Sequence, residues 1–313
     1  MEPEITESVD LCLSDGRLNP DAVGWTRHPL HRANLTGWGR AKRWEYWCVQ
    51  APDWALAVTV SHIDYLALHQ VFFVDFTTGE EIDTSTIAPF ARGPVLPDRS
   101  GAGPARARTK HLSIDLIPNT AGLRLVAHTD RVDADVQITR PPGHESMAVV
   151  IPWSEKRFQY TEKDNTLPAA GRVVVDGQPR DLPAGQTWAV LDHGRGKWPY
   201  DNTWNWGSGS GTVDGHVIGL QFGGKWTEGT GMTENALCID GTVFKISQEL
   251  EWRYDTTDWL APWTVRGDDV DVTLTPGYER STRTNAGVIF TEVHQCFGTW
   301  NGTVRAGGEE YAV

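Results

Sequence analysis

Short runs of β-branched and aromatic residues, separated by Gly, Pro and Asp-Gly pairs, recur along the whole chain. Such runs, bounded by turn residues, are typical of β-strands. The runs cover residues 55–60, 70–76, 112–117, 123–128, 134–139, 147–153, 172–175, 217–222, 236–239, 243–247 and 270–275. Because no segment carries a convincing amphipathic helix pattern, the chain is predicted to be all-β.

Three Asp-Gly pairs, beginning at Asp176, Asp214 and Asp240, each separate two apolar runs. Asp-Gly favours the type I′ turn, whose twist matches that of a two-residue β-hairpin. The pairs therefore predict antiparallel pairing between strands that are neighbours in the sequence.

Charge narrows the choice of partner. The chain of 313 residues has a formal net charge of -13, whereas nucleic acids and anionic membranes select clustered Lys and Arg. We therefore expect no nucleic acid partner and a small ligand that is apolar, neutral or cationic. No glycine-rich dinucleotide motif opens a helix, so no cofactor is expected.

Cysteines and chain-end patterns bear on the compartment. The four Cys are scattered without a CxxC pair, which predicts small buried side chains in a reducing environment. The first ten residues lack a signal-peptide pattern, and no apolar run is long enough to cross a membrane. We expect a soluble cytoplasmic protein without membrane insertion.

One long loop is predicted at residues 92–108, RGPVLPDRSGAGPARAR. It is interpreted as a solvated connector, with a lid or a partner-docking loop as the alternative. Residues 134–141 and 270–276 are weakly similar, and the sequence pattern changes near residues 153–166. Together these features predict two similar β-halves with a boundary near residue 165.

The densest group of candidate site residues lies between Thr187 and Asp240, where Trp side chains alternate with ionisable groups. Apolar rings around a few polar groups are typical of a ligand pocket. Asp192-His193 follows an apolar run, and a His near neutrality suits acid–base catalysis. The alternative is a structural His193 beside an Asp192–Arg195 ion pair.

Further candidates surround this pair. Glu228 and Glu234 flank a glycine-rich bend and could act as acid and base, although exposed carboxylates are the alternative. Asn205 lies between two Trp residues of an alternating strand. The candidate substrate-binding residues are Trp198, Trp204, Trp206, Trp226, Arg195, Tyr200 and Asn235, with core packing as the alternative for each Trp. No metal site is expected, since His28 and His31 lack a third ligand nearby.

Several long motifs resemble a bacterial family catalogued as domain of unknown function 2804. The motifs are VGWTRHPL, KRWEYW, LDHGRGKWPY, WNWGSGSG, GGKWTEGTGMTENAL and HQCFGTWNG. That family is similar to the AttH-like and carotenoid hydratase (hydroxyneurosporene synthase) group, which also includes kievitone hydratase, fungal Diels–Alderases and yeast ceramide-transfer proteins. The resemblance implies two lipocalin-like antiparallel β-barrels or sandwiches packed side by side, over residues 1–165 and 166–313, and a lipophilic ligand.

The resemblance also assigns site residues. Asp192 and His193 match the Asp-His of the relatives, while Asn205 stands where the hydratases commonly have Asp. Because an amide cannot protonate a double bond, the acid would then be Glu228 or Glu234. We expect a cofactor-free hydratase, dehydratase or isomerase acting on a lipophilic metabolite such as a terpenoid or polyketide. The alternatives are a lipid-binding or transfer protein without chemistry, and a pericyclase that works by shape.

Overall fold

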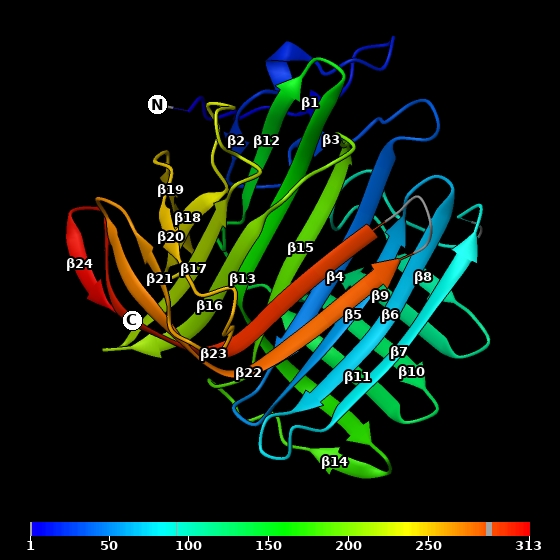
Figure 1. The fold of residues 1–313 in the computed structure, drawn as a ribbon, viewed down its shortest axis with the longest axis vertical. Coiled ribbons are helices and arrows are strands. Elements are labelled where there is room, and N and C mark those ends of the chain that lie inside the picture. Colours follow the sequence, from blue (N-terminus) through cyan, green and yellow to red (C-terminus); the bar gives the residue numbers. More distant parts are fainter. Residues whose placement is uncertain (1, 92, 286–289) are drawn as a thin grey trace. The chain divides into compact units, whose positions relative to one another are not determined.

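The computed structural model describes residues 2–91, 93–285 and 290–313, and β-strands make up nearly all of the regular secondary structure in these residues (Figure 1). Among the described residues there is one helical element, the single 3₁₀ turn η1 (Pro20–Ala22). Accordingly, the described residues contain no helix of membrane-spanning length and apolarity. The chain divides into two compact units, Met1–Ser247 and Gln248–Val313. The predicted all-β, lipocalin-like fold class is confirmed.

A large antiparallel sheet dominates unit 1. Its main path contains, in spatial order, β7 (Glu81–Pro89), β6 (Leu66–Asp75), β5 (Trp54–His62), β4 (Ala41–Gln50), β15 (Trp188–Lys197), β13 (Arg157–Val175), β11 (Val132–Thr139), β10 (Gly122–Thr129), β9 (Leu112–Asn119) and β8 (Ala105–Arg108). Three further strands join it at the side: β12 (Met147–Ser154) and β14 (Gln178–Arg180), which pair with β13, and β2 (Trp25–Thr26), which pairs with β12. A separate short parallel pair is formed by β1 (Val9–Asp10) and β3 (His31–Arg32).

The large sheet curls into a half-barrel. The curl brings β5, β6 and β7 into contact with β8 and β9 across the interior of the sheet. Alternate residues of the ten strands of the main path point inward, and they form one buried apolar cluster that includes Trp47, Phe73, Leu125 and Leu191. Removing this apolar surface from water is the main stabilising contribution to the unit.

The predicted loop at residues 92–108 is only partly a loop. Ala105–Arg108 form β8, with Ala105 and Ala107 in the barrel core. The carbonyl oxygens of Pro97 and Asp98 accept hydrogen bonds from the Arg195 guanidinium and from the backbone of Ala33. The interpretation as a solvated connector is therefore wrong for Ala105–Arg108, while Arg92 lies outside the described residues.

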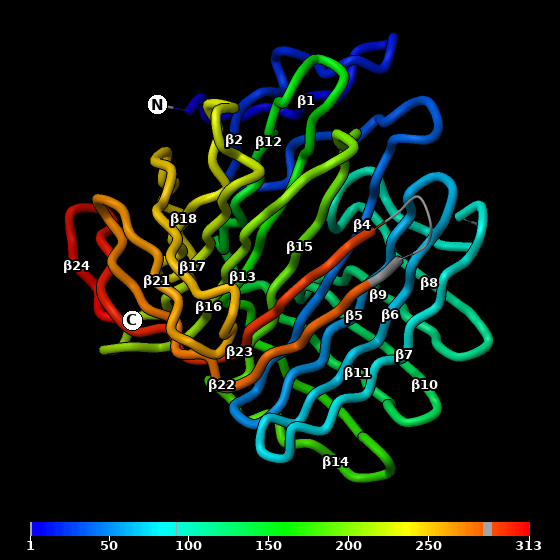
Figure 2. The backbone as a smooth tube through the Cα atoms, viewed as in Figure 1, coloured from blue at the N-terminus to red at the C-terminus, as the bar shows by residue number. Residues whose placement is uncertain are grey.

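Strand β13 carries a bulge near the predicted domain boundary. Its pairing with β15 shifts register between Asp164 and Leu167. The inserted residues reach a second sheet: Asn165 Nδ2 donates to the Leu220 carbonyl at 2.8 Å, and the Thr166 amide donates to Ser210 Oγ at 3.0 Å. Residue 165 thus lies inside a continuous strand (Figure 2), and the division into domains 1–165 and 166–313 stays a prediction.

The second sheet of unit 1 has the order β16 (Asn205–Val213), β17 (His216–Gly224), β18 (Asn235–Ile239) and β19 (Thr242–Ile246). Asp214-Gly215 and Asp240-Gly241 connect its hairpins, and Asp176-Gly177 connects β13 to β14. All six of these residues have positive φ, as the type I′ turn requires. The hairpin predictions are confirmed.

Unit 2 is a five-stranded antiparallel sheet. Its order is β20 (Glu251–Arg253), β21 (Trp263–Arg266), β22 (Val270–Asn285), β23 (Phe290–Ala306) and β24 (Glu309–Ala312). The long β22–β23 hairpin forms most of it, and Val265, Val272 and Val304 are buried.

Candidate active site

The register of three neighbouring strands places the candidate site. Lys163 on β13 pairs with Asp192 on β15, which pairs with Tyr46 on β4. Directly paired residues share a face of a sheet, and sequence neighbours point to opposite faces. Lys163, Asp192 and Tyr46 therefore share the outer face, and Asp192 and His193 point in opposite directions.

Two glycines in LDHGRGKWPY give the outer face its shape. A Cβ on Gly194 would lie 2.0 Å from the Trp44 ring, and a Cβ on Gly196 would lie 2.3 Å from Gln159 Oε1. Because real Cβ atoms do not approach so closely, only glycine leaves space here for Trp44 and for Gln159, which accepts a hydrogen bond from Trp198 Nε1 at 2.6 Å. The alternation in this motif thus places aromatic rings on one face of β15.

Three charged side chains meet on the outer face, and we call Lys163, Asp192 and Glu234 the lysine cluster. Lys163 Nζ lies 2.8 Å from Asp192 Oδ1 and 3.1 Å from Glu234 Oε1. The Lys163 ammonium lies 4.6 Å from the centre of the Trp206 ring. Trp226 Nε1 donates a hydrogen bond of 3.2 Å to Glu234 Oε2. Burial lowers the pKa of Lys163, but the two carboxylates outweigh it and raise that pKa.

Glu234 is the titratable group of the cluster best suited to proton transfer. Its side chain is 1% exposed. Burial raises its pKa to about 7; Lys163 opposes this shift and Asp192 adds to it. A carboxyl group that titrates near neutral pH can donate a proton as well as accept one. Asp192 is 19% exposed and can contact water.

Tryptophan rings surround Trp198 beside the cluster. Their ring centres lie 5.7 Å (Trp44), 5.9 Å (Trp153), 6.1 Å (Trp204) and 6.4 Å (Trp226) from that of Trp198. We call these five residues the aromatic wall. Trp226 is nearly buried, whereas Trp204 is 39% exposed. The wall therefore runs from the protein interior to the surface.

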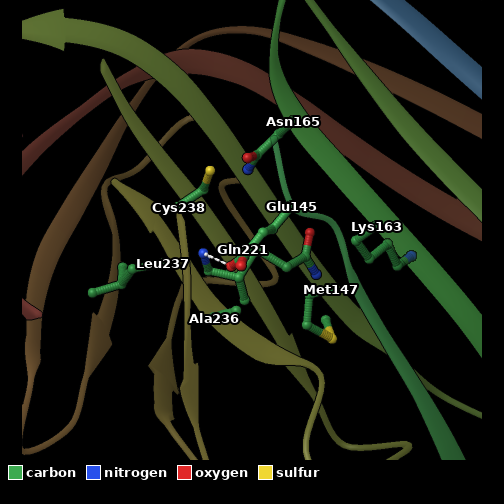
Figure 3. A pocket seen from close by; sticks show the side chains of 9 residues that line it. Glu145, Met147, Lys163, Asn165, Gln221, Ala236, Leu237 and Cys238 are labelled. Atoms are coloured by element: carbon green, nitrogen blue, oxygen red, sulfur yellow. Dashed lines mark hydrogen bonds between the residues drawn. The ribbon is translucent and has the colours of Figure 1, made fainter. Parts of the chain in front are cut away.

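A small cavity of about 10 Å³ lies beside the cluster, between β13 and the second sheet. Lys163 and Asn165 line it from β13, and Gln221 and Ala236 line it from the facing strands (Figure 3). Gln221 Oε1 accepts a hydrogen bond from Trp206 Nε1 at 3.0 Å. This space corresponds to about one water molecule with polar neighbours.

His193 and Arg195 belong to the opposite, inner face. His193 Nδ1 lies 3.2 Å from Glu45 Oε1, so Glu45 orients the ring and the predicted Asp192–His193 pair is not formed. Burial and then Arg195 lower the pKa of His193 to about 4. Arg195 is 1% exposed and donates to the carbonyls of Trp44, Gly194 and Pro97. Their roles as catalyst and substrate contact stay predictions, but neither residue joins the lysine cluster.

The remaining predicted residues are spread around the site. Asn235 Oδ1 accepts a hydrogen bond from the Gly223 amide at 2.8 Å and so shapes the bend beside Glu234. Asn205 is buried at the start of β16. Glu228 and Tyr200 are exposed, Tyr200 at 75%. Within the described ranges, no three His, Cys, Asp or Glu side chains gather as metal ligands.

Lys163 is the main residue that the sequence analysis missed. It lies in the segment QYTEKDNT, where charged residues interrupt a long strand. Charged side chains are rarely buried without a partner, so a Lys in the middle of a strand was the available indication. Glu45, in KRWEYW, was missed for a similar reason.

The raised pKa of Glu234 predicts a pH-dependent stability difference. Its ordinary pKa is 4.5 and its folded value is about 7, so between these values the folded protein holds a proton that the unfolded chain has lost. Wild-type stability therefore falls as pH rises through this window. The free energy of unfolding of Glu234→Gln, minus that of the wild type, should increase by about 3 kcal/mol from pH 4.5 to 7.

Urea unfolding at a series of pH values measures this difference. Glu228→Gln is the matched control, because Glu228 is exposed in the same loop and its difference from wild type should stay flat. Other titrating groups cancel in the subtraction. A flat difference for Glu234→Gln as well would mean that Glu234 ionises normally.

Comparisons with known proteins agree with this fold. A profile of a family described as "Domain of unknown function (DUF2804)" matches residues 2–313. The structure of CghA with Sch210972 is similar, with a TM-score of 0.55, 12% identity, and coverage of 87% of this chain and 86% of that chain. Because the identity is so low, this similarity concerns the fold.

Two further solved structures are less similar. Kievitone hydratase from Nectria haematococca has a TM-score of 0.48 and 10% identity, covering 80% of this chain and 79% of its own. An AttH-like protein from Nitrosomonas europaea has a TM-score of 0.45 and 14% identity, with coverage of 82% and 88%. Among curated proteins, no significant match is found.

Proposed function

This chain belongs to the DUF2804 family, and we propose that it is a cofactor-free acid–base enzyme acting on an apolar, unsaturated small molecule. The observation that carries the proposal is Glu234, a buried carboxyl group whose pKa is raised to about 7 beside the aromatic wall. Its proton would be delivered to a carbon–carbon double bond or a carbonyl. The reaction would be hydration, dehydration or isomerisation.

The neighbours of Glu234 suit this role. Lys163 holds Asp192 by an ion pair and stabilises the Glu234 carboxylate after it has lost its proton. Trp226 Nε1 holds one carboxyl oxygen and so fixes the orientation of the group. Positioned proton transfer of this kind contributes about 10²–10⁴-fold to a rate.

The aromatic wall supports an apolar substrate. Trp rings provide a large apolar surface, and their faces stabilise a cation by about 0.5–2 kcal/mol. Protonation of a double bond produces such a cation, and rings that exclude bulk water would protect it. CghA, which shares the fold, is known in a structure with the small molecule Sch210972, and this supports ligand binding by the architecture.

His193, the predicted proton donor, is given no such role in this proposal. Its pKa of about 4 makes it neutral at pH 7, and it lies on the inner face of β15. Glu228 and Glu234 were both predicted as possible acids or bases, and we assign the role of the acid to Glu234.

Turnover in oxygen-18 water tests the proposal. Purified protein would be incubated with a panel of polyunsaturated and polycyclic compounds, and the products read by mass spectrometry. An oxygen-18-labelled product indicates hydration, and an unlabelled isomer indicates isomerisation; the proposal expects either to require Glu234. An isomer that Glu234→Gln forms at the wild-type rate would favour a pericyclase. Retention of a compound without change would favour a lipid-binding protein.

A further inference from the structure

Basic side chains gather around one cavity of a chain that is acidic overall. The cavity has a volume of about 280 Å³ and lies in unit 1, between residues 15–17, residues 36–41, the β12–β13 turn and the end of β15. Its lining includes the side chains Arg17, Arg40, Lys156, Arg157 and Lys197, together with Trp38. We call these six residues the basic pocket. Asp15 is the one acidic residue of this lining.

Most of this positive charge is not compensated. Arg17 Nε lies 2.7 Å from Asp15 and Arg17 Nη1 lies 2.9 Å from Glu155, so Arg17 is neutralised locally. The other four cations form no ion pair with any carboxylate in residues 2–91, 93–285 and 290–313. The positive charge around the cavity therefore exceeds the negative charge, although the chain as a whole carries -13.

Backbone carbonyls hold two of these cations in position. Lys197 Nζ donates to the Gly16 carbonyl at 2.7 Å, and Arg157 Nη1 donates to the Lys156 carbonyl at 2.8 Å. A carbonyl oxygen orients a cation without cancelling its charge, and each group keeps further N–H donors. Positioned cations with unused donors are what an anionic group requires.

The edge of the basic pocket is apolar and open. Trp38 is 74% exposed, so its ring is open to contact by a ligand. Gly37 has φ +85°, and a Cβ at that position would meet no atom within 4 Å. A ligand could therefore place a charged group among the cations and an apolar body against Trp38.

We propose that the basic pocket binds a phosphate-bearing ligand whose apolar part packs against Trp38. Several uncompensated cations favour a multiply charged phosphate over a monocarboxylate, and guanidinium groups match its oxygens geometrically. The cavity also leaves space beyond the phosphate itself. No residue of the lysine cluster lines it, so this inference stands apart from the acid–base activity.

Isothermal titration calorimetry with three probes tests the inference. The probes also distinguish a free phosphate compound from a phosphate attached to an apolar chain. Inorganic phosphate presents the anion alone, dodecyl phosphate adds an apolar chain, and dodecyl maltoside presents the chain without the anion. We expect dodecyl phosphate to bind most tightly, and we expect its affinity to fall when NaCl is added. Trp38→Ala should lower the affinity for dodecyl phosphate and leave the affinity for inorganic phosphate unchanged.

The double variant Arg40→Gln/Arg157→Gln should weaken both phosphate probes by at least about tenfold. Neither side chain forms an ion pair in the part of the chain described, so thermal unfolding should be unchanged and confirm a folded protein. Lys110→Gln, an exposed cation elsewhere, is the matched control and should bind like the wild type.

If inorganic phosphate and dodecyl phosphate bind equally tightly, the pocket binds the phosphate group alone. Its ligand would then be a free phosphate compound, and the contact with Trp38 would be contradicted. Absence of binding by both phosphate probes would overturn the inference. So would affinities unchanged in the double variant, or dodecyl maltoside binding as tightly as dodecyl phosphate. An affinity of the wild type for dodecyl phosphate that does not change with NaCl concentration would also contradict a charged site.

Discussion

Lys163→Met is expected to lower the free energy of unfolding by about 3–5 kcal/mol at pH 8, the range for breaking a buried ion pair. Lys163 is 6% exposed and is the shared partner of Asp192 and Glu234. Without its ammonium, two neighbouring carboxylates would repel each other with little water to solvate Glu234. At pH 5 the loss should be smaller, because Glu234 is then protonated.

Lys42→Met is the matched control for this prediction. Lys42 also lies over a Trp ring, 4.2 Å from the centre of Trp198, and burial lowers its pKa. It has no carboxylate partner in the described ranges, so its replacement removes only a cation–π contact of about 0.5–1 kcal/mol. Chemical denaturation at both pH values measures the two losses. A Lys163→Met loss no larger than that of Lys42→Met would contradict the ion network.

Addition of Glu234→Gln to Lys163→Met should recover part of the stability. The double variant keeps a single carboxylate, Asp192, which is 19% exposed and can be hydrated. Groups in direct contact behave non-additively, so we expect the double variant to be more stable than Lys163→Met alone. Strict additivity of the two single-variant effects would show that the groups act independently.

Glu234→Gln is expected to reduce kcat/KM by about 10²–10⁴-fold on any substrate that the wild type converts. The amide keeps the size of the side chain and can still accept from Trp226 Nε1, but it cannot donate an acidic proton. Affinity should therefore change little while turnover is lost. Glu228→Gln should retain wild-type rates, because Glu228 is exposed.

The pH profile of the wild type gives an independent test of this role. As the acid, Glu234 is active when protonated, and its pKa is about 7. The rate should therefore be constant at pH 5–6 and fall about tenfold per unit of pH well above 7. A rate that instead rises through pH 7 would make Glu234 a base, and a rate independent of pH would exclude it from proton transfer.

The sequence was sufficient to predict the fold class and to bring together several residues of the candidate site. Alternating apolar runs and Asp-Gly turns predicted antiparallel strands because both depend on local backbone geometry. Clustering of Trp198, Trp206, Trp226 and Glu234 in one stretch predicted their proximity: Trp198 directly follows β15, Trp206 lies on β16, and Trp226 and Glu234 lie in the bend between β17 and β18. These inferences required no long-range information.

Lys163 could not be predicted in the same way. It joins Asp192 through the pairing of β13 with β15, which depends on strand register. Register is set by the burial of whole strands and is not visible in one segment. The bulge at Asn165 and Thr166 likewise became apparent only where β13 meets the second sheet.

The separation of Asp192 from His193 follows from strand geometry. Neighbours in a strand point to opposite faces, and β15 extends through both residues to Lys197, whereas the pair was predicted only to follow an apolar run. The adjacent Asp-His pair was interpreted as a functional pair because of its aromatic neighbours and because of the resemblance. The partner of His193 is Glu45, which lies on another strand and was not considered.

The proposed function depends most directly on the proton that Glu234 holds at neutral pH. Infrared spectra of the wild type minus Glu234→Gln, recorded from pH 5 to 9, would show the carbonyl band of a protonated carboxyl group. Glu162, whose pKa burial also raises to about 7, is present in both proteins and cancels. We predict a difference band that is full at pH 5 and half lost near pH 7. Absence of this band at pH 5 and above would mean that Glu234 is a permanently ionised partner of Lys163, and would contradict the acid–base mechanism.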